Sequence, residues 1–259
     1  MNKILSLILE SQKNKIEVLK KNQQALRSLA KKAPHPVSFK KAIKREGKIS
    51  LIGEIKQASP SAGLLREDFS AVGIATQFEK LKVNAISVLT EEEFFLGKIN
   101  YIEDIKKEIS LPVLRKDFIL EEVQVLESRA VGADAVLLIM RILDEAKFGR
   151  LYALSKDLGM DVLVEVHTEK ELKKVLNTGV EIVGVNNRNL HTLAVDLGHT
   201  KKLIPFLPAD VVRVSESGIS SLKDVLLLKG LGVDAVLVGE ALMKAQNLEE
   251  KIKELHIDA

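Results

Sequence analysis

Short apolar runs alternate with longer amphipathic segments through most of the chain. From residue 49 onward, eight runs rich in leucine and β-branched residues are almost continuously apolar. Such runs are typical of strands that are covered on both faces of a parallel sheet. We predict strands at 50–56, 85–90, 112–116, 135–140, 162–166, 182–186, 211–215 and 235–239. Helical patterns lie between them, at 71–81, 120–131, 145–158, 169–178 and 222–231.

The spacing of these runs predicts a closed α/β barrel. Each strand with its helix has the length of one βα unit, and eight units match a (β/α)8 TIM barrel. Segments 132–139 and 232–239 share the pattern Gly-x-Asp-Ala-Val-Leu, which indicates two related half-barrels. An open doubly wound sheet is the alternative fold. It is disfavoured because no strand is followed by a Gly-x-Gly-x-x-Gly turn.

The first part of the chain differs from the rest in charge. Residues 1–48 hold 13 Lys and Arg but three Glu, whereas the remainder carries a net negative charge. A basic segment can indicate nucleic-acid binding. Here the charges are scattered, Phe39 is the one aromatic residue, and apolar positions fall near helical spacing. We therefore expect no nucleic-acid partner and interpret residues 1–46 as a helical extension of one barrel domain, 1–259. Because the eight βα units are complete from about residue 47, we expect the barrel to close without this extension.

Composition further limits the class of protein. The chain of 259 residues has no cysteine, so disulfides and thiol chemistry are not available. The N-terminal apolar run 4–9 ends at Glu10, which is too short for a signal peptide. No stretch approaches the roughly 20 apolar residues of a membrane span. These features predict a cytoplasmic protein without a membrane partner.

Two opposite charges interrupt the first predicted strand. Glu54 and Lys56 are two residues apart, so in a strand they project from the same face. Charges on a buried strand are costly unless that face opens on a polar cavity. The segment then turns through Ser59, Pro60 and Ser61. A structural ion pair at a strand end is the alternative interpretation of this pattern.

Similar polar strand ends recur along the chain. In a parallel barrel the carboxyl ends of all strands meet at one rim, where active sites are assembled. One polar strand end is usually a solvated loop residue, but six of the eight predicted strands end in this way. The residues are Glu54, Lys56, Arg115, Lys116, Asp117, Phe118, Glu165, Asn186, Asn187, Arg188, Ser215, Glu216, Ser217, Gly218, Gly239 and Glu240.

Two sub-sites can be separated by their chemistry. Ser217-Gly218 and Gly239-Glu240 stand where a barrel binds phosphate through backbone N–H groups at a helix N-terminus.

Lysines and carboxylates make up the second sub-site. Lys56 and Lys116 beside Glu54, Glu165 and Glu216 can bind an anionic substrate and transfer protons. We expect no metal and no cofactor, because the carboxylates are interleaved with lysines and cysteine ligands are absent.

In these features the chain resembles the indole-3-glycerol-phosphate synthase family over nearly its whole length. The N-terminal helical extension is part of the resemblance. Six motifs in order on the predicted strands carry it. They are Glu54-Ile-Lys56-x-x-Ser59-Pro60-Ser61, Leu114-Arg-Lys116-Asp-Phe118, Val164-Glu165-Val166-His, Asn186-Asn-Arg188-Asn-Leu190, Ser215-Glu216-Ser217-Gly218 and Val238-Gly239-Glu240.

The resemblance implies a reaction and catalytic roles. The family closes the indole ring of 1-(2-carboxyphenylamino)-1-deoxyribulose 5-phosphate and releases carbon dioxide and water. Lys116 would be the general acid that protonates the substrate carbonyl. Lys56 would pair with the substrate carboxylate and assist dehydration. Glu165 would accept the proton of the later step, and Glu54 and Asn186 would position hydroxyls and Lys116.

The resemblance also implies binding roles. Phe95, Phe118 and Leu137 would form an apolar slot for the anthranilate ring. The other substrate-binding residues would be Arg188, Leu190, Glu216 and Ser217 in the pocket, with Ser59, Pro60, Ser61, Gly218, Gly239 and Glu240 at the phosphate.

Two positions depart from the family pattern, and two other functions stay open. Glu240 replaces the hydroxyl residue that commonly follows the last glycine, and Lys98 replaces a small residue in the loop after the second strand. A related isomerase such as phosphoribosylanthranilate isomerase would use the same phosphate site, but it is expected to need a cysteine. A non-enzymatic barrel that serves as a scaffold or phosphate sensor is the other alternative.

Overall fold

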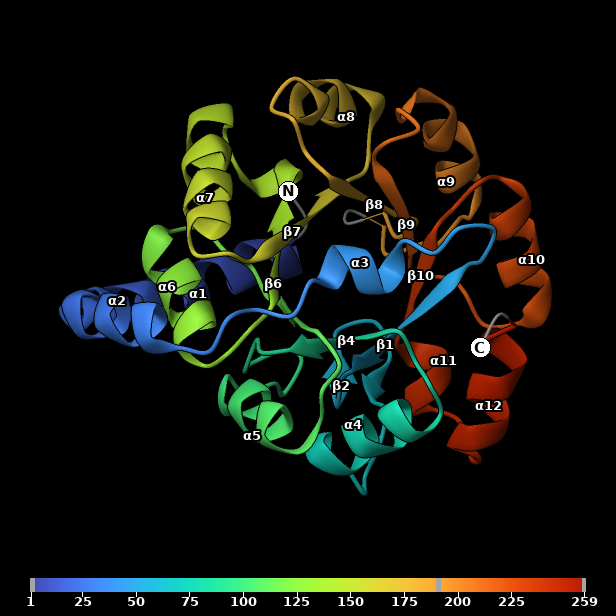
Figure 1. Ribbon diagram of the computed structural model, residues 1–259, viewed down its shortest axis with the longest axis horizontal. Helices are drawn as coiled ribbons and strands as arrows, with labels where there is room; N and C mark the ends of the chain where they lie inside the picture. The colour runs from blue at the N-terminus through green and yellow to red at the C-terminus, as the bar shows by residue number, and fades with distance from the viewer. Residues whose placement is uncertain (1–2, 190–191, 258–259) are drawn as a thin grey trace.

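The chain forms a closed barrel of eight parallel strands in a computed structural model that describes residues 3–189 and 192–257 (Figure 1). Around the barrel the hydrogen-bonded order is β1-β10-β9-β8-β7-β6-β5-β4, and every neighbouring pair is parallel. The predicted (β/α)8 fold is therefore confirmed. The strands are β1 (Ser50–Ile55), β4 (Ala85–Leu89), β5 (Val113–Lys116), β6 (Ala135–Ile139), β7 (Asp161–Val166), β8 (Ile182–Asn186), β9 (Val212–Glu216) and β10 (Ala235–Val238).

Helices follow the strands and surround the barrel. A small hairpin, β2 (Ala58–Ser59) and β3 (Gly63–Leu64), was not predicted and follows β1. Several helices begin after a side chain that accepts the backbone N–H three residues ahead, as Ser70, Asp144, Thr168, Ser221 and Asn247 do. The helices are α4 (Ala71–Lys80), α5 (Asn100–Glu108), α6 (Glu122–Ala130), α7 (Glu145–Asp157), α8 (Glu169–Leu176), α9 (Gly198–Leu203), α10 (Leu222–Gly230), α11 (Glu240–Met243) and α12 (Leu248–Leu255), with 3₁₀ turns η1 (Met140–Ile142) and η2 (Ile204–Phe206).

The core has two layers, which explains the continuous apolar runs. One apolar cluster fills the barrel interior and includes Ile52, Leu114, Leu163 and Leu237. A second cluster fills the space between the strands and the surrounding helices. Because both faces of each strand are covered, almost every strand residue is buried.

A short turn is repeated before five strands. A residue with positive φ stands two or three positions before each of these strands. These residues are 82 before β4, 132 before β6, 159 before β7, 179 before β8 and 232 before β10. Glycine occupies four of these positions because it adopts this backbone conformation without steric cost. The pattern that the sequence shows at 132 and 232 is thus a turn used around the barrel.

The polar residue of this turn fastens neighbouring strands together. Asp134 accepts the N–H of Val113, and Asp234 accepts the N–H of Arg213, both at 2.8 Å. The side-chain oxygen of Asn84 accepts the N–H of Leu51 in the same way. The repeated aspartates therefore hold the N-terminal edge of the sheet.

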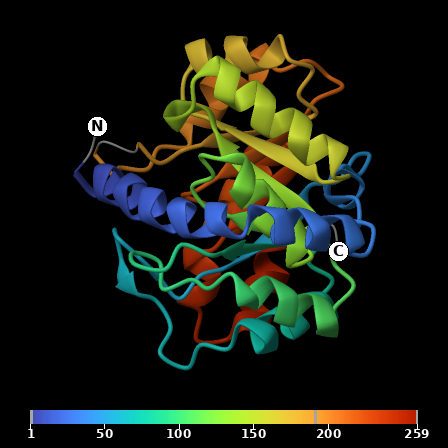
Figure 2. The same cartoon turned by 90° about the vertical axis from the view of Figure 1, so that its left-hand side faces the viewer.

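The N-terminal extension contributes to both ends of the barrel. It comprises α1 (Lys3–Lys21), α2 (Gln23–Lys32) and α3 (Phe39–Ile43). Helices α1 and α2 cross the side of the barrel and pack on α6, with α1 starting at the end that carries the β2–β3 hairpin (Figure 2). Helix α3 lies across the opposite end (Figure 1).

This arrangement corrects one expectation about residues 1–46. The eight βα units were expected to close without help from the extension. Instead Phe39 and Ile43 are fully buried within the inner apolar cluster and complete the core at the N-terminal end of the strands. They remove apolar surface of the barrel floor from water, so this part of the extension belongs to the fold.

Among the residues the structure describes, no helix is long and apolar enough to cross a membrane.

Candidate active site

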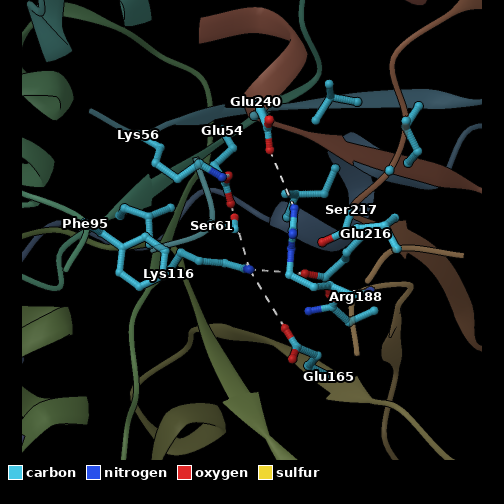
Figure 3. A pocket seen from close by; sticks show the side chains of 18 of the residues that line it. Glu54, Lys56, Ser61, Phe95, Lys116, Glu165, Arg188, Glu216, Ser217 and Glu240 are labelled. Atoms are coloured by element: carbon cyan, nitrogen blue, oxygen red, sulfur yellow. Dashed lines mark hydrogen bonds and ion pairs between the residues drawn. The ribbon is translucent and has the colours of Figure 1, made fainter. Parts of the chain in front are cut away.

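A cavity of about 580 Å³ opens at the carboxyl ends of the strands. This volume is within the range of small-molecule sites. Its wall holds side chains from both predicted sub-sites, and Figure 3 shows them pointing toward one another. The predicted residues in the wall are Glu54, Lys56, Ser61, Phe95, Lys116, Phe118, Leu137, Glu165, Asn186, Arg188, Glu216, Ser217, Gly218, Gly239 and Glu240.

Two of the predicted substrate-binding residues, Ser59 and Pro60, do not line this cavity. Ser59 is buried in β2, where its Oγ lies 3.4 Å from the Oγ of Ser61. Pro60 follows it in the turn and does not line the cavity. Leu190 is outside the described residues.

Lys116 lies at the centre of a cluster of carboxylates (Figure 3). Its Nζ is 3.3 Å from Oε2 of Glu216 and 3.8 Å from Oε2 of both Glu54 and Glu165. Lys56 donates a short hydrogen bond to Oε1 of Glu54. Two ammonium groups thus face three buried carboxylates, and the site is nearly balanced in charge.

The cluster changes the pKa values of its members. Burial alone would lower the pKa of Lys116, but Glu216, Glu54 and Glu165 outweigh it and raise this pKa above the ordinary range. Burial would raise the pKa of Glu54, yet Lys56 and Lys116 hold it below its usual value. Lys116 is therefore a firmly held ammonium in the resting site.

Glu216 behaves differently from Glu54. Burial raises the pKa of Glu216 to about 7, because the attraction of Lys116 offsets only part of that effect. Within the described residues neither of its carboxylate oxygens has a hydrogen-bond partner. Glu216 thus titrates near neutrality within contact distance of Lys116.

Two glycines make room for these carboxylates. A Cβ on Gly239 would collide with the carboxylate of Glu54, and a Cβ on Gly184 would collide with that of Glu216. Gly239 was expected to matter mainly for the approach of a phosphate. The structure adds a second reason for glycine there, because any side chain would displace Glu54.

The apolar side of the cavity is built from two loops. Phe95 follows β4 and Phe118 follows β5, and their ring centroids are 6.3 Å apart. Leu137 on β6 lies in the same wall. Rings at this distance contact each other, and together they present an apolar wall against which a flat aromatic group can pack.

The opposite side of the cavity is formed by the loop after β9 and the start of α11. Ser217 and Gly218 both have positive φ, and the strained backbone at Ser217 is of the kind that is held at functional sites. Glu240 begins α11 and forms ion pairs with two basic side chains of this region. Its carboxylate is 2.7 Å from Nζ of Lys244 and 3.5 Å from Nη2 of Arg188.

A buried polar network behind the cavity was missed in the sequence. Gln12 of α1 is buried, and its amide donates to Oδ1 of Asp117 at 3.0 Å. Gln124 donates to Oε1 of Gln12 at 3.0 Å and also to the carbonyl oxygen of Phe118. The network therefore fixes the loop that carries Phe118. A glutamine within the apolar stripe of α1 was the signal in the sequence.

The same helix also touches the other aromatic loop. Lys15 of α1 forms an ion pair at 3.0 Å with Glu92, in the loop that carries Phe95. The extension thus contacts both loops of the apolar wall, and its role extends beyond the barrel floor.

Among the described residues, no group of three or more histidine or acidic side chains is arranged to hold a metal ion.

Fold and cavity together define a (β/α)8-barrel enzyme whose C-terminal rim carries a cluster of two lysines and three carboxylates. Residues 5–255 match the family model described as indole-3-glycerol phosphate synthase. The chain therefore belongs to the indole-3-glycerol phosphate synthase family, whose members are carboxy-lyases of tryptophan biosynthesis.

Individual relatives agree with this assignment. The chain is 52% identical over 217 residues to indole-3-glycerol phosphate synthase of Thermoanaerobacter sp. (strain X514), covering 84% of this chain and 83% of the relative. It is 45% identical over 255 residues to the enzyme of the same name from Desulforamulus reducens, covering 97% and 96%.

Solved structures with distant sequences share the fold. A 3-hexulose-6-phosphate synthase from Salmonella typhimurium superposes with a TM-score of 0.65 at 17% identity, covering 81% of this chain and 97% of the other. A tryptophan synthase chain from Pyrococcus furiosus gives 0.60 at 13% identity, covering 82% and 98%. At these identities the likeness concerns the fold alone.

Proposed function

We propose that the chain converts 1-(2-carboxyphenylamino)-1-deoxyribulose 5-phosphate into indole-3-glycerol phosphate, carbon dioxide and water. The observation that carries the proposal is Lys116 among three carboxylates, between an aromatic slot and an anion-binding side. A substrate with an aromatic ring at one end and a phosphate at the other fits such a pocket.

The first step joins two carbons. The ring carbon that bears the carboxylate attacks the ketone carbon, and the ketone oxygen takes a proton from the ammonium of Lys116. Loss of carbon dioxide then restores the aromatic ring. Lys56, beside Glu54, is the cation available to pair with the substrate carboxylate before it leaves.

The second step removes water. The hydroxyl on the former ketone carbon takes a second proton and leaves, and the neighbouring methylene carbon loses a proton to form the indole double bond. We assign that proton to Glu165, whose carboxylate is buried at the cavity wall. Glu54 and Asn186, both in the wall, hold Lys116 and the substrate hydroxyls.

Binding residues are assigned by their side of the cavity. Phe95, Phe118 and Leu137 would hold the anthranilate ring. The support for this assignment is that the two phenyl rings contact each other and line the cavity together with Leu137. The phosphate and ribulose part of the substrate would be held by Ser61, Arg188, Glu216, Ser217, Gly218, Gly239 and Glu240. Ser59 and Pro60 would shape the turn behind Ser61. Leu190 is retained as a binding residue from the family motif.

The chain's other properties are part of the proposal. Contacts of α1 with the loops of the slot support residues 1–259 working as one domain. A phosphorylated small molecule is the partner expected for this family. A cytoplasmic location stays a prediction.

Turnover of the synthetic substrate, followed by the fluorescence of the indole product, tests the function. Catalysis supports the proposal. Phosphate binding without turnover would favour a sensor or scaffold, and isomerisation of another phosphorylated sugar would favour a different barrel enzyme.

The acid–base assignment predicts a pH dependence. As the pH rises through about 7, Glu216 becomes ionised and attracts the Lys116 ammonium more strongly. The lysine then becomes a weaker proton donor, so kcat/KM should fall across this range. Glu216→Gln should lack this limb of the pH profile, whereas the exposed control Glu250→Gln should keep it. A limb that persists in Glu216→Gln would belong to another group.

Glu240 predicts an effect on phosphate affinity. Its carboxylate forms ion pairs with Arg188 and Lys244, and its negative charge repels an incoming anion. Glu240→Ser should tighten binding of inorganic phosphate about three- to tenfold, as expected for one partly exposed charge contact worth about 1 kcal/mol. Titration calorimetry measures it, with the exposed Glu249→Ser as control. Weaker binding would mean that Glu240 is needed to hold the loop in place.

A further inference from the structure

A buried histidine beside the cavity has no part in the chemistry described so far. His167 follows β7, and its side chain is 4% exposed. It does not line the cavity. Within the described residues neither ring nitrogen has a hydrogen-bond partner. An enclosed imidazole in this state is costly unless it serves a purpose.

Its two nitrogens face two carboxylates on opposite sides. Nε2 is 3.4 Å from Oε1 of Glu165, and Nδ1 is 3.8 Å from Oε2 of Glu171. Glu171, on α8, has a partly exposed side chain and also accepts the backbone N–H of His167. On its other side, Glu165 is 3.8 Å from Nζ of Lys116. These groups form a row from the catalytic lysine toward solvent.

The charged groups that face His167 come from four elements. Glu165 lies on β7, Glu171 on α8, Arg141 on η1 and Lys116 on β5. Burial, together with Arg141 and Lys116, outweighs the two carboxylates and lowers the pKa of His167. The imidazole is therefore neutral at pH 7, with one nitrogen that donates and one that accepts.

The proposed reaction needs a proton from solvent. The ketone oxygen carries no hydrogen and leaves as water, so it must take up two protons. The methylene carbon releases one proton, which Glu165 can return to Lys116. The substrate carboxylate leaves as neutral carbon dioxide, so one further proton must enter the site in each turnover.

We propose that His167 relays this proton from Glu171 to Glu165, which passes it to Lys116. The imidazole accepts a proton at Nδ1 from the solvent side and donates the proton on Nε2 to Glu165. A rotation of the ring or a second transfer then restores the starting tautomer. No bond other than those to protons changes. Distances of 3.4 and 3.8 Å are longer than hydrogen bonds, and such contacts in free enzymes tighten when substrate binds.

The relay rests on the proposed role of Glu165. It predicts that His167 acts on rate and leaves binding unchanged, because the ring does not contact the cavity. A packing role alone predicts that an isosteric apolar ring would preserve the rate.

Three variants test the relay. His167→Phe keeps the size of the ring, His167→Gln can still donate to Glu165 but cannot relay, and His167→Ala leaves space for added imidazole. All three should lower kcat about 10²-fold, the lower range for general acid–base groups, with KM and inorganic phosphate binding unchanged. The exposed His35→Phe is the matched control. In His167→Ala, kcat should rise with imidazole concentration.

The outcomes separate the possible roles. A normal kcat in His167→Gln overturns the relay and leaves His167 with positioning alone, and a normal kcat in His167→Phe leaves only packing. A slow His167→Ala that does not respond to imidazole also overturns the relay. Glu165→Gln is measured alongside. If Glu165→Gln retains activity, the assignment of Glu165 as the base is wrong. If Glu165→Gln is inactive but His167→Gln has a normal kcat, only the relay is refuted.

Discussion

Replacing Lys116 by methionine is expected to lower kcat by about 10²–10⁴-fold, the contribution of a general acid. Ring closure needs a proton at the ketone oxygen, and Lys116 is the cation that three buried carboxylates hold in the cavity. Methionine keeps most of the length of the side chain, so the variant should fold and bind phosphate ligands. Single-turnover kinetics with the synthetic substrate measures the effect on chemistry directly.

A matched substitution controls for the loss of a lysine. Lys98→Met removes a positive charge from the exposed loop after β4, outside the cavity wall. That variant should retain the parent kcat. If Lys116→Met kept more than about a tenth of the activity, the loss would be smaller than general acids contribute, and another group would be the proton donor.

Arg115→Met is expected to lower the free energy of unfolding by about 3–5 kcal/mol, because removing one partner of a buried ion pair leaves charges uncompensated. The Arg115 side chain is fully buried and lies 2.9 Å from Asp117 and 2.8 Å from Glu127. It also donates to Thr90 and Ser128. Urea unfolding gives the difference in free energy.

The control uses the same substitution at the surface. Arg150→Met removes an exposed arginine whose contact with Glu122 is 3.9 Å, so it should cost less than about 1 kcal/mol. Equal stability of the two variants would show that the buried network tolerates the loss of its cation.

The barrel could be predicted because its strands carry a local signal. A strand covered on both faces must be apolar throughout, and this pattern marked all eight strands to within about two residues of the observed bounds. The cavity followed from the rule that strand ends share one rim. Lys116 and Glu165 lie close together for that reason, although 49 positions separate them in the sequence.

What the sequence could not show depends on contacts between distant segments. Gln12 meets Asp117 across 105 positions, and no local pattern marks that pair. Ser59 and Pro60 were expected in the site, but the β2–β3 hairpin turns them away from the cavity wall. The place of Phe39 within the barrel floor likewise required the closed sheet.

The extension is synthesised before the barrel strands that it contacts, and it completes its contacts late. Lys44 pairs with Asp234, and Phe39 and Ile43 pack in a cluster that includes Leu237 of the last strand. Gln12 must wait for Asp117 and Gln124. Translation adds residues at about 5–20 per second, so on the ribosome α3 remains without its partners for roughly ten seconds or more and α1 for roughly five seconds or more. The segment that closes one end of the barrel and supports the loops at the other is thus synthesised before the barrel, but it can dock fully only after the last strand has been made.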